Sequence, residues 1–188
     1  MKRILLLLLL SLIAILPVSA QTPFYQGKTV QIRVGFAAGG AFDVWARVIA
    51  NYLGKYVPGN PMFVVQNMTG GGLMIAANYV YGVAKPDGLT LGVVSPAMYV
   101  EQVTGKKKVQ YDWFKFSYIG PPAMPADRLK MLRDGFNKMI TDPELLADAK
   151  KKGLDATPAS GEELEAMIKD AGVPSQEIIR QLKPLLEN

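Results

Sequence analysis

The stretch TVQIRVGFAAGGAFDVWARVIANYL, residues 29–53, decides the fold predicted for this chain. It begins with alternating apolar and polar residues over residues 29–36, which is the pattern of a half-buried strand. A turn rich in glycine follows at residues 35–43. Apolar residues then recur at helical spacing over about residues 43–53, and Gly54 ends this pattern. The stretch therefore predicts a strand, a turn and a helix in direct succession.

The turn at residues 35–43 favours an anionic ligand. Its glycines allow backbone N–H groups to point at one spot, and the positive end of the helix dipole lies at the same place. Asp43 stands where a helix N-cap is expected; alternatively, it orients the turn or binds a hydroxyl or amine of a ligand. A tight turn that binds no ligand is the simpler interpretation, so other parts of the chain must decide between the two.

Two more strand-and-turn units follow the first one. In the second turn, residues 67–72, Asn67 is expected either to cap the next helix or to hold the turn through side-chain hydrogen bonds. The third strand follows the tight turn of residues 85–88. The predicted elements are strands over residues 62–66 and 89–94, and helices over residues 73–83 and from Ser95-Pro96 to about residue 104. This alternation predicts a parallel sheet covered by helices, with the turns gathered at its carboxyl edge.

The sequence changes character after residues 121–122, where charged amphipathic segments replace the strands. A helix is predicted from Pro125 to about residue 140, because its apolar residues mark one helical face. Asp142 followed by Pro143 is typical of an N-cap with proline in the first helical turn. Further helices are expected over residues 143–153, 161–171 and 175–186, and a short strand over residues 154–157.

The start of the chain is typical of a secretory signal peptide. A basic beginning at Lys2 and Arg3 precedes a nearly continuous apolar run, and small residues end at Ala20. The apolar run is too short to span a bilayer comfortably. We therefore expect cleavage after Ala20 and a periplasmic protein. The expected organisation is a signal peptide over residues 1–20, an α/β ligand-binding lobe over residues 21–120, and a helical segment over residues 121–188 that packs back on the lobe.

The composition excludes several kinds of chemistry. The chain has no cysteine and no histidine, which excludes Ser-His and Cys-His catalysis and the common zinc sites. No Asp-rich loop suggests another metal site, and neither a Walker motif nor a spaced dinucleotide fingerprint is present, so we expect no metal and no cofactor.

Charge is distributed unevenly along the chain. Residues 21–120 carry nine Lys and Arg against four Asp and Glu, a balance that fits an anionic ligand. The basic run of residues 106–108 lacks interleaved aromatic residues, so we interpret it as a solvated loop and expect no nucleic-acid partner.

Four stretches together resemble the periplasmic substrate-binding receptors of tripartite tricarboxylate transporters, the Bug-type solute-binding proteins. They are residues 36–43 with Ala46 and Arg47 following, residues 65–72 centred on Asn67 and Gly70, residues 84–91, and residues 122–127 together with residues 142–144 and 160–163. The resemblance covers most of residues 24–170. Three positions depart from the family pattern: Gly35 replaces a usual proline, Leu73 replaces a usual glycine, and Ser95 only approximately matches a usual Gly-Thr.

The resemblance implies an α/β fold of the type II periplasmic-binding-protein class, and capture of a small organic carboxylate for integral-membrane transporter subunits rather than catalysis. In the family, the first loop binds a carboxylate largely through backbone N–H groups and ordered water, and the loop after the third strand faces the cleft. Carried over to this sequence, the candidate ligand-binding residues are Phe36, Ala37, Ala38, Gly39, Gly40, Phe42, Asp43, Asn67, Gly70, Ser95, Pro96 and Ala97.

The second lobe of the family is not evident in this sequence. The front half of family members runs into that lobe before the chain returns to the C-terminal helices, whereas here Gly120 passes directly into residues 121–122. On the order of 100 residues, a domain's worth, are absent at this point. The resemblance therefore predicts essentially one lobe with C-terminal helices, and weak or no solute binding. A monomer is expected, or a dimer if a second copy replaces the missing lobe.

Other functions remain open at this stage. The retained lobe could serve as a sensor or interaction module without transport, which is the main alternative. An enzyme that uses Asp43 is the weakest hypothesis, because the chain lacks histidine, cysteine and a paired-carboxylate motif. Complete loss of function through the shortening is the fourth.

Overall fold

The computed structural model describes residues 22–116, 120–154, 159–172 and 174–186, so the predicted signal peptide and most of the predicted strand over residues 154–157 lie outside the described residues. Three strands form one parallel sheet in the order β2-β1-β3. They are β1 (Thr29–Val34), β2 (Met62–Asn67) and β3 (Thr90–Val93). The predicted parallel α/β lobe is confirmed.

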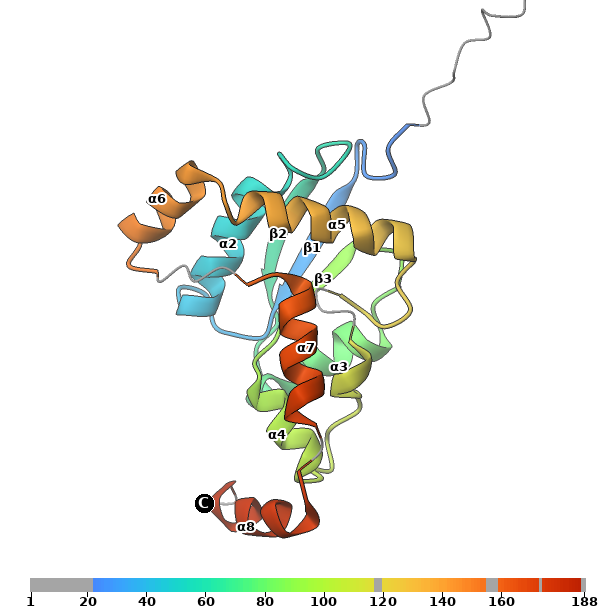
Figure 1. Cartoon of the computed structure of the whole chain (residues 1–188), viewed down its shortest axis with the longest axis vertical. Helices are drawn as coiled ribbons and strands as arrows, with labels where there is room; N and C mark the ends of the chain where they lie inside the picture. Colours follow the sequence, from blue (N-terminus) through green and yellow to red (C-terminus); the bar gives the residue numbers. More distant parts are fainter. Residues whose placement is uncertain (1–21, 117–119, 155–158, 173, 187–188) are drawn as a thin grey trace, which may run out of the picture.

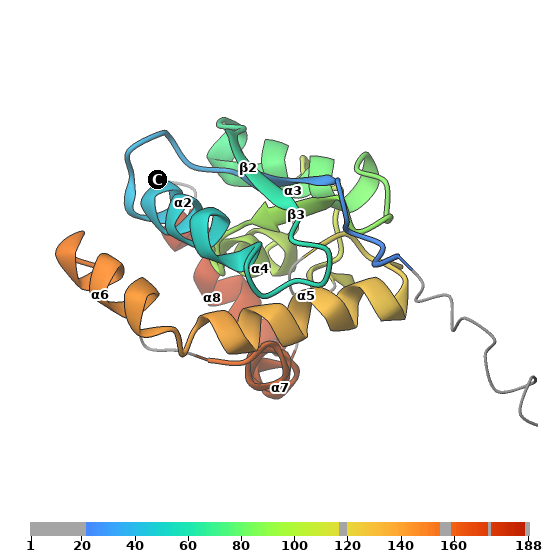
Figure 2. The ribbon, with the colours of Figure 1, turned by 90° about the horizontal axis from the view of Figure 1, so that it is seen from above.

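Helices cover both faces of this sheet (Figure 2). Helices α2 (Ala41–Leu53) and α5 (Ala126–Met139) lie on one face, and α3 (Met74–Gly82) lies on the other. The side chains of β1 explain this arrangement, since Val30, Ile32 and Val34 alternate with more exposed neighbours and point to the face of α2 and α5.

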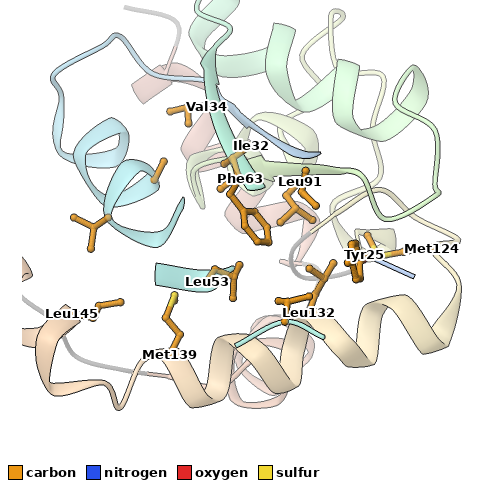
Figure 3. Packing of buried hydrophobic residues seen from close by; sticks show 14 residues of the cluster. Tyr25, Ile32, Val34, Leu53, Phe63, Leu91, Met124, Leu132, Met139 and Leu145 are labelled. Atoms are coloured by element: carbon orange, nitrogen blue, oxygen red, sulfur yellow. The ribbon is translucent and has the colours of Figure 1, made fainter. Parts of the chain in front are cut away.

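The main core lies between the sheet, α2 and α5. Figure 3 shows Phe63 and Leu91 of the sheet directed towards Leu132 and Met139 of α5, with Leu53 of α2 between them. Leu132 is completely buried. A helix from the back half of the chain is therefore part of the same core as the three strands.

The other face of the sheet packs closely against α3. A Cβ atom at Gly92 of β3 would lie 3.0 Å from Cγ2 of Val80, so a glycine allows the close approach of this helix. A second hydrophobic cluster extends from α3 to α4 (Ala97–Val103) and to the short 3-10 helix η3 (Trp113–Lys115). Its buried members are Ala77, Met98, Tyr111 and Trp113.

The remaining helices are α6 (Pro143–Lys151), α7 (Gly161–Ala171) and α8 (Gln176–Leu186). As predicted, Asp142 is the N-cap of α6, and its side chain accepts a hydrogen bond from the N–H of Glu144 at 2.8 Å. Helix α7 begins at a reciprocal capping box, in which Ser160 and Glu163 bind each other's backbone N–H groups.

Helix α7 links the two clusters, since it extends from α5 to α4 (Figure 1). At its start, Arg133 of α5 forms an ion pair with Glu165. Just beyond its end, the hydroxyl of Tyr99 in α4 donates to the carbonyl oxygen of Gly172 at 2.6 Å. Within the described part of the chain, no helix is both long and apolar enough to cross a membrane.

Several predicted boundaries were wrong at the carboxyl edge. Strand β1 ends at Val34 rather than at residue 36, and α2 begins at Ala41, two residues before Asp43. The second glycine turn extends into a 3-10 helix, η2 (Gly71–Leu73), before α3 begins. At β1 and α3 the turns occupy residues that the apolar pattern predicts to be regular, whereas α2 takes two residues that were predicted to belong to the turn.

Candidate functional site

The three turns after the strands start at one level of the sheet. The register pairs Val34 with both Asn67 and Val93, so each strand ends in the same row. Backbone hydrogen bonds continue this alignment beyond the strands. The N–H of Met68 donates to the carbonyl oxygen of Val34 at 2.7 Å, and the N–H of Gly35 donates to the carbonyl oxygen of Val93 at 3.2 Å. The predicted gathering of the turns at the carboxyl edge is therefore present.

The first turn presents the start of α2 to solvent. Residues 37–42 are exposed, and Gly39 has φ +83°, a conformation that a side chain would strain. Gly40 is the N-cap of α2 and no described side chain caps this end, so the prediction that Asp43 is the N-cap is wrong. The N–H groups of the first helical turn have no acceptor within the helix, and they carry its positive partial charge.

Asp43 lies beneath this turn, with a side chain 2% exposed. Its Oδ2 accepts from the N–H of Gly39 at 2.8 Å and from Nε of Arg47 at 2.9 Å. Its Oδ1 accepts from Nη2 of Arg47 at 3.0 Å and from Nδ2 of Asn67 at 2.8 Å. Four donors thus occupy the carboxylate, which fills its usual capacity. In this arrangement Asp43 orients the turn and offers no free acceptor to a ligand.

The same contacts explain the ionisation of Asp43. The hydrogen bonds from the Arg47 side chain, and next the one from the Gly39 backbone, hold the pKa of the Asp43 carboxyl well below its usual range, although burial opposes this shift. The paired carboxylate raises the pKa of Arg47 in return. Asp43 and Arg47 are therefore both charged at neutral pH and cancel each other beneath the turn.

Asn67 joins the second turn to the first. Its Nδ2 donates to the carbonyl oxygen of Phe36 at 3.0 Å as well as to Asp43, and its Oδ1 accepts from Nη2 of Arg47 at 3.1 Å. The expectation that Asn67 caps the following helix is wrong, because α3 begins several residues later with Leu73 as its N-cap. The side chain instead reaches across to the neighbouring strand end.

The rest of the second turn is strained and exposed. Gly70 has φ +123°, and a Cβ atom there would lie 2.8 Å from Cδ1 of Ile75. Leu73 has φ +76°, in the left-handed region that favours glycine, at a position where the resembled family usually has glycine. The Leu73 side chain lies next to Gly35: a Cβ atom built at Gly35 would be 3.5 Å from both Cβ and Cδ2 of Leu73. Gly35 and Leu73 thus depart from the family pattern at adjoining places.

The third turn is built mainly by local bonds. Oγ of Ser95 accepts from the N–H of Ala97 at 3.2 Å, and the carbonyl oxygen of Ser95 accepts from the N–H of Met98 at 2.9 Å. Pro96 and Ala97 are exposed at the start of α4. Sheet register brings this turn to the same edge, whereas the side-chain network described above joins only the first two turns.

An aromatic pair flanks the exposed N–H groups. Phe36 and Phe42 stack with ring centroids 3.9 Å apart and an interplanar angle of 9°. Phe42 remains 40% exposed, so an apolar surface lies beside the polar turn. A carboxylate with a hydrocarbon body would match this combination of groups.

Arg47 is the residue whose role the sequence analysis missed. Its sequence position marks it only as part of a motif, yet it contacts both Asp43 and Asn67. The spacing contained a signal, because Asp and Arg four residues apart on a helix are neighbours on its surface. The contact with Asn67 depends on the pairing of two strands and had no local signal.

An exposed helix start of this kind favours an anion over a cation. Within the described residues, no cluster of three or more Asp, Glu, His or Cys side chains could hold a metal ion.

Comparisons with known proteins give one curated relative. No protein-family model matches the chain. The relative is the UPF0065 protein in the gbd 5′ region of Cupriavidus necator, 32% identical over 108 residues, which are 57% of this chain and 32% of that protein. The chain thus matches about a third of the length of its curated relative.

Similar solved structures belong to one class. The periplasmic binding protein BugD has a TM-score of 0.57 at 14% identity, with 87% of this chain and 98% of that chain covered, which shows a common fold. MatC from Rhodopseudomonas palustris, solved with bound malate, is 34% identical over 47% of this chain and 29% of that chain, with a TM-score of 0.42. A structure described as a periplasmic transporter is 35% identical over 48% of this chain and 30% of that chain, with a TM-score of 0.42.

The fold is therefore that of the periplasmic binding proteins, with about one lobe present. UPF0065 is the Bug family, so the curated relative and the predicted resemblance agree. The chain is thus similar to the Bug-type periplasmic solute-binding proteins over about half of its length. The similar solved structures are periplasmic solute-binding proteins.

Proposed function

We propose that this protein captures a small organic carboxylate at the carboxyl edge of its sheet. The observation that carries this proposal is the exposed start of α2 at residues 40–42, which no side chain of the described residues caps, above an Asp43 whose charge Arg47 already cancels. A carboxylate is the ligand that such a helix start attracts, because N–H groups and dipole both favour an anion. The Bug-type relationship supports the same class of ligand.

The proposed role follows from the relationship to solute-binding receptors. The protein acts outside the cytoplasm, in the periplasm, after removal of its signal peptide. It delivers its ligand to integral-membrane transporter subunits and performs no chemistry on it.

The proposed affinity is low for the isolated chain. Residues 37–42, Gly70 and Pro96 are exposed, so solvent surrounds a ligand on the side away from the sheet. Ligand sites normally bury most of the ligand, and water screens exposed charges. We expect dissociation constants in the millimolar range, roughly −4 kcal/mol of binding free energy.

Calorimetry on the purified protein tests this function. The ligands are malate, citrate and tartrate, each compared with its neutral ester. We expect weak saturable heat with the acids and none with the esters, because the helix start binds the carboxylate charge. Equal heats from acids and esters would contradict carboxylate capture, and micromolar affinity for a monomer would contradict the open half-site. Light scattering on the same sample gives the oligomeric state.

A further inference from the structure

The polar cluster beneath the first turn spans three separate elements. Asp43 and Arg47 belong to α2, Asn67 ends β2, and Phe36 follows β1. Each contact between them involves the side chain of a residue in helix α2 or strand β2. The cluster therefore defines where the backbone of residues 36–39 lies relative to α2.

Arg47 is the centre of this cluster. Its Nε and Nη2 bind the two oxygens of Asp43 in the bidentate manner that suits a planar guanidinium. The same Nη2 also donates to Oδ1 of Asn67, so one residue orients both partners. Asn67 in turn holds the carbonyl oxygen of Phe36, and Asp43 holds the N–H of Gly39.

The charge of Asp43 makes its partner important for anion binding. A buried carboxylate next to a turn that binds anions would repel them, and the low polarity of its surroundings would strengthen the repulsion. Arg47 cancels this charge, while its own side chain stays 51% exposed and solvated. Loss of Arg47 would therefore disturb both the shape of the turn and the local potential.

We propose that Arg47 is a positioning residue for the anion site: through Asp43 and Asn67 it fixes the turn of residues 36–42 and removes the negative charge beneath it. This inference rests on the proposed carboxylate function and deepens it. Asp43, by contrast, serves as the anchor of the turn and does not contact the ligand.

Four variants separate positioning from general destabilisation. Arg47→Met removes charge and hydrogen bonds while keeping most of the side-chain volume, and Arg47→Lys keeps the charge without the bidentate geometry. Asp43→Asn/Arg47→Met removes both charges. The control, Arg180→Met, makes the same replacement at an exposed ion pair of α8 with Glu177.

Two readouts are measured on the full purified chain. Hydrogen exchange of the Gly39 amide in ligand-free protein reports the order of the turn, and titration with malate by NMR reports affinity. We expect Arg47→Met to accelerate exchange and to weaken malate binding, each by about tenfold, as expected for loss of charged hydrogen bonds. Arg180→Met should leave both readouts unchanged. Arg47→Lys should recover part of the affinity and little of the protection.

The double variant gives the sharpest outcome. If the charge of Asp43 opposes the anion, Asp43→Asn/Arg47→Met binds malate more tightly than Arg47→Met alone, which a purely structural role would not produce. The inference is overturned if the double variant binds no better, or if Arg47→Met behaves like Arg180→Met in both readouts. If the unmodified protein binds no carboxylate, the proposed function fails. The positioning role is tested separately: it is overturned if the Gly39 amide exchanges at an unchanged rate in both Arg47→Met and Arg47→Lys. Arg47→Lys also serves where Arg47→Met does not fold.

Discussion

The two ends of α2 each lie beside a buried aspartate, and the two aspartates act differently. At the start of α2, Asp43 binds donors that come from the two turns and from its own helix. Near its end, Lys55 and Tyr56 donate to Asp142, which caps α6 in the back half of the chain. The Tyr56 hydroxyl lies 2.5 Å from Oδ2 of Asp142.

The difference teaches how similar chemistry serves two purposes. Both carboxylates accept from a cation, a neutral side chain and a backbone N–H, and both have a lowered pKa. The Asp43 cluster shapes an exposed turn, where little apolar surface is buried. The Asp142 cluster instead holds together helices that are far apart in sequence. Disturbing Asp43 should therefore affect binding first, and disturbing Asp142 should affect stability first.

The largest effect on stability is expected from the apolar core that both ends share. Leu132→Ala should lower the free energy of unfolding by about 3 kcal/mol, because it leaves a cavity between α5 and the sheet. Urea denaturation followed by circular dichroism measures this loss. A loss near zero would mean that α5 does not pack in the core of the sheet. The two ends of α2 could then not be compared as parts of one cooperative core.

A smaller loss is expected from Asp142→Ala. The change removes the N-cap of α6 and leaves the Tyr56 hydroxyl and Lys55 without their acceptor, so the melting temperature should fall by roughly 5 °C. Malate affinity should stay within about twofold, since the turn at the start of α2 is untouched. If affinity fell as strongly as stability, the two ends would not be independent.

The third prediction concerns acid. A carboxyl with a lowered pKa stabilises the folded state above its ordinary pKa of about 4, and this stabilisation is lost as the pH falls below that value. When the pH is lowered from 6 to 3, the melting temperature of Asp43→Asn should therefore fall by roughly 3 °C less than that of the unmodified protein. Asp142→Asn should behave similarly. Parallel pH profiles for variants and unmodified protein would show that neither carboxyl contributes.

The smallest effect is expected from Phe42→Ala. The change removes a stacked ring that is already 40% exposed, so the free energy of unfolding should fall by only about 1 kcal/mol. Phe42→Leu serves as its matched control, since it keeps apolar volume without the ring. A loss as large as that of Leu132→Ala would show that the turn is part of the core rather than an exposed binding element.

Much of the lobe could be predicted from local patterns. The alternation of Val30, Ile32 and Val34 specified a strand, and the glycines after it specified the turn. The helix boundary differs from the prediction because Asp43, a good N-cap by residue type, is the third residue of a helix that begins at Ala41 with Gly40 as its N-cap. A side chain at that position can bind backward to the turn and so stabilise the helix start without being its cap.

The long-range contacts could not be predicted from the sequence. Asn67 reaches Phe36, 31 residues away, only because β1 and β2 pair in parallel with one particular register. Tyr56 and Asp142 are separated by 86 residues and meet through the packing of α5 and α6 beside α2. Nothing in the local pattern of either segment specifies such partners, since they depend on the assembled fold.

The most direct test of the central claim maps where a carboxylate binds. Backbone amide shifts of the purified protein are followed by NMR as malate or its dimethyl ester is added. Carboxylate capture by the start of α2 predicts saturable shifts concentrated at residues 37–42 with malate, and none there with the ester. Shifts located elsewhere, equal shifts with both compounds, or no shifts at millimolar malate would contradict the claim.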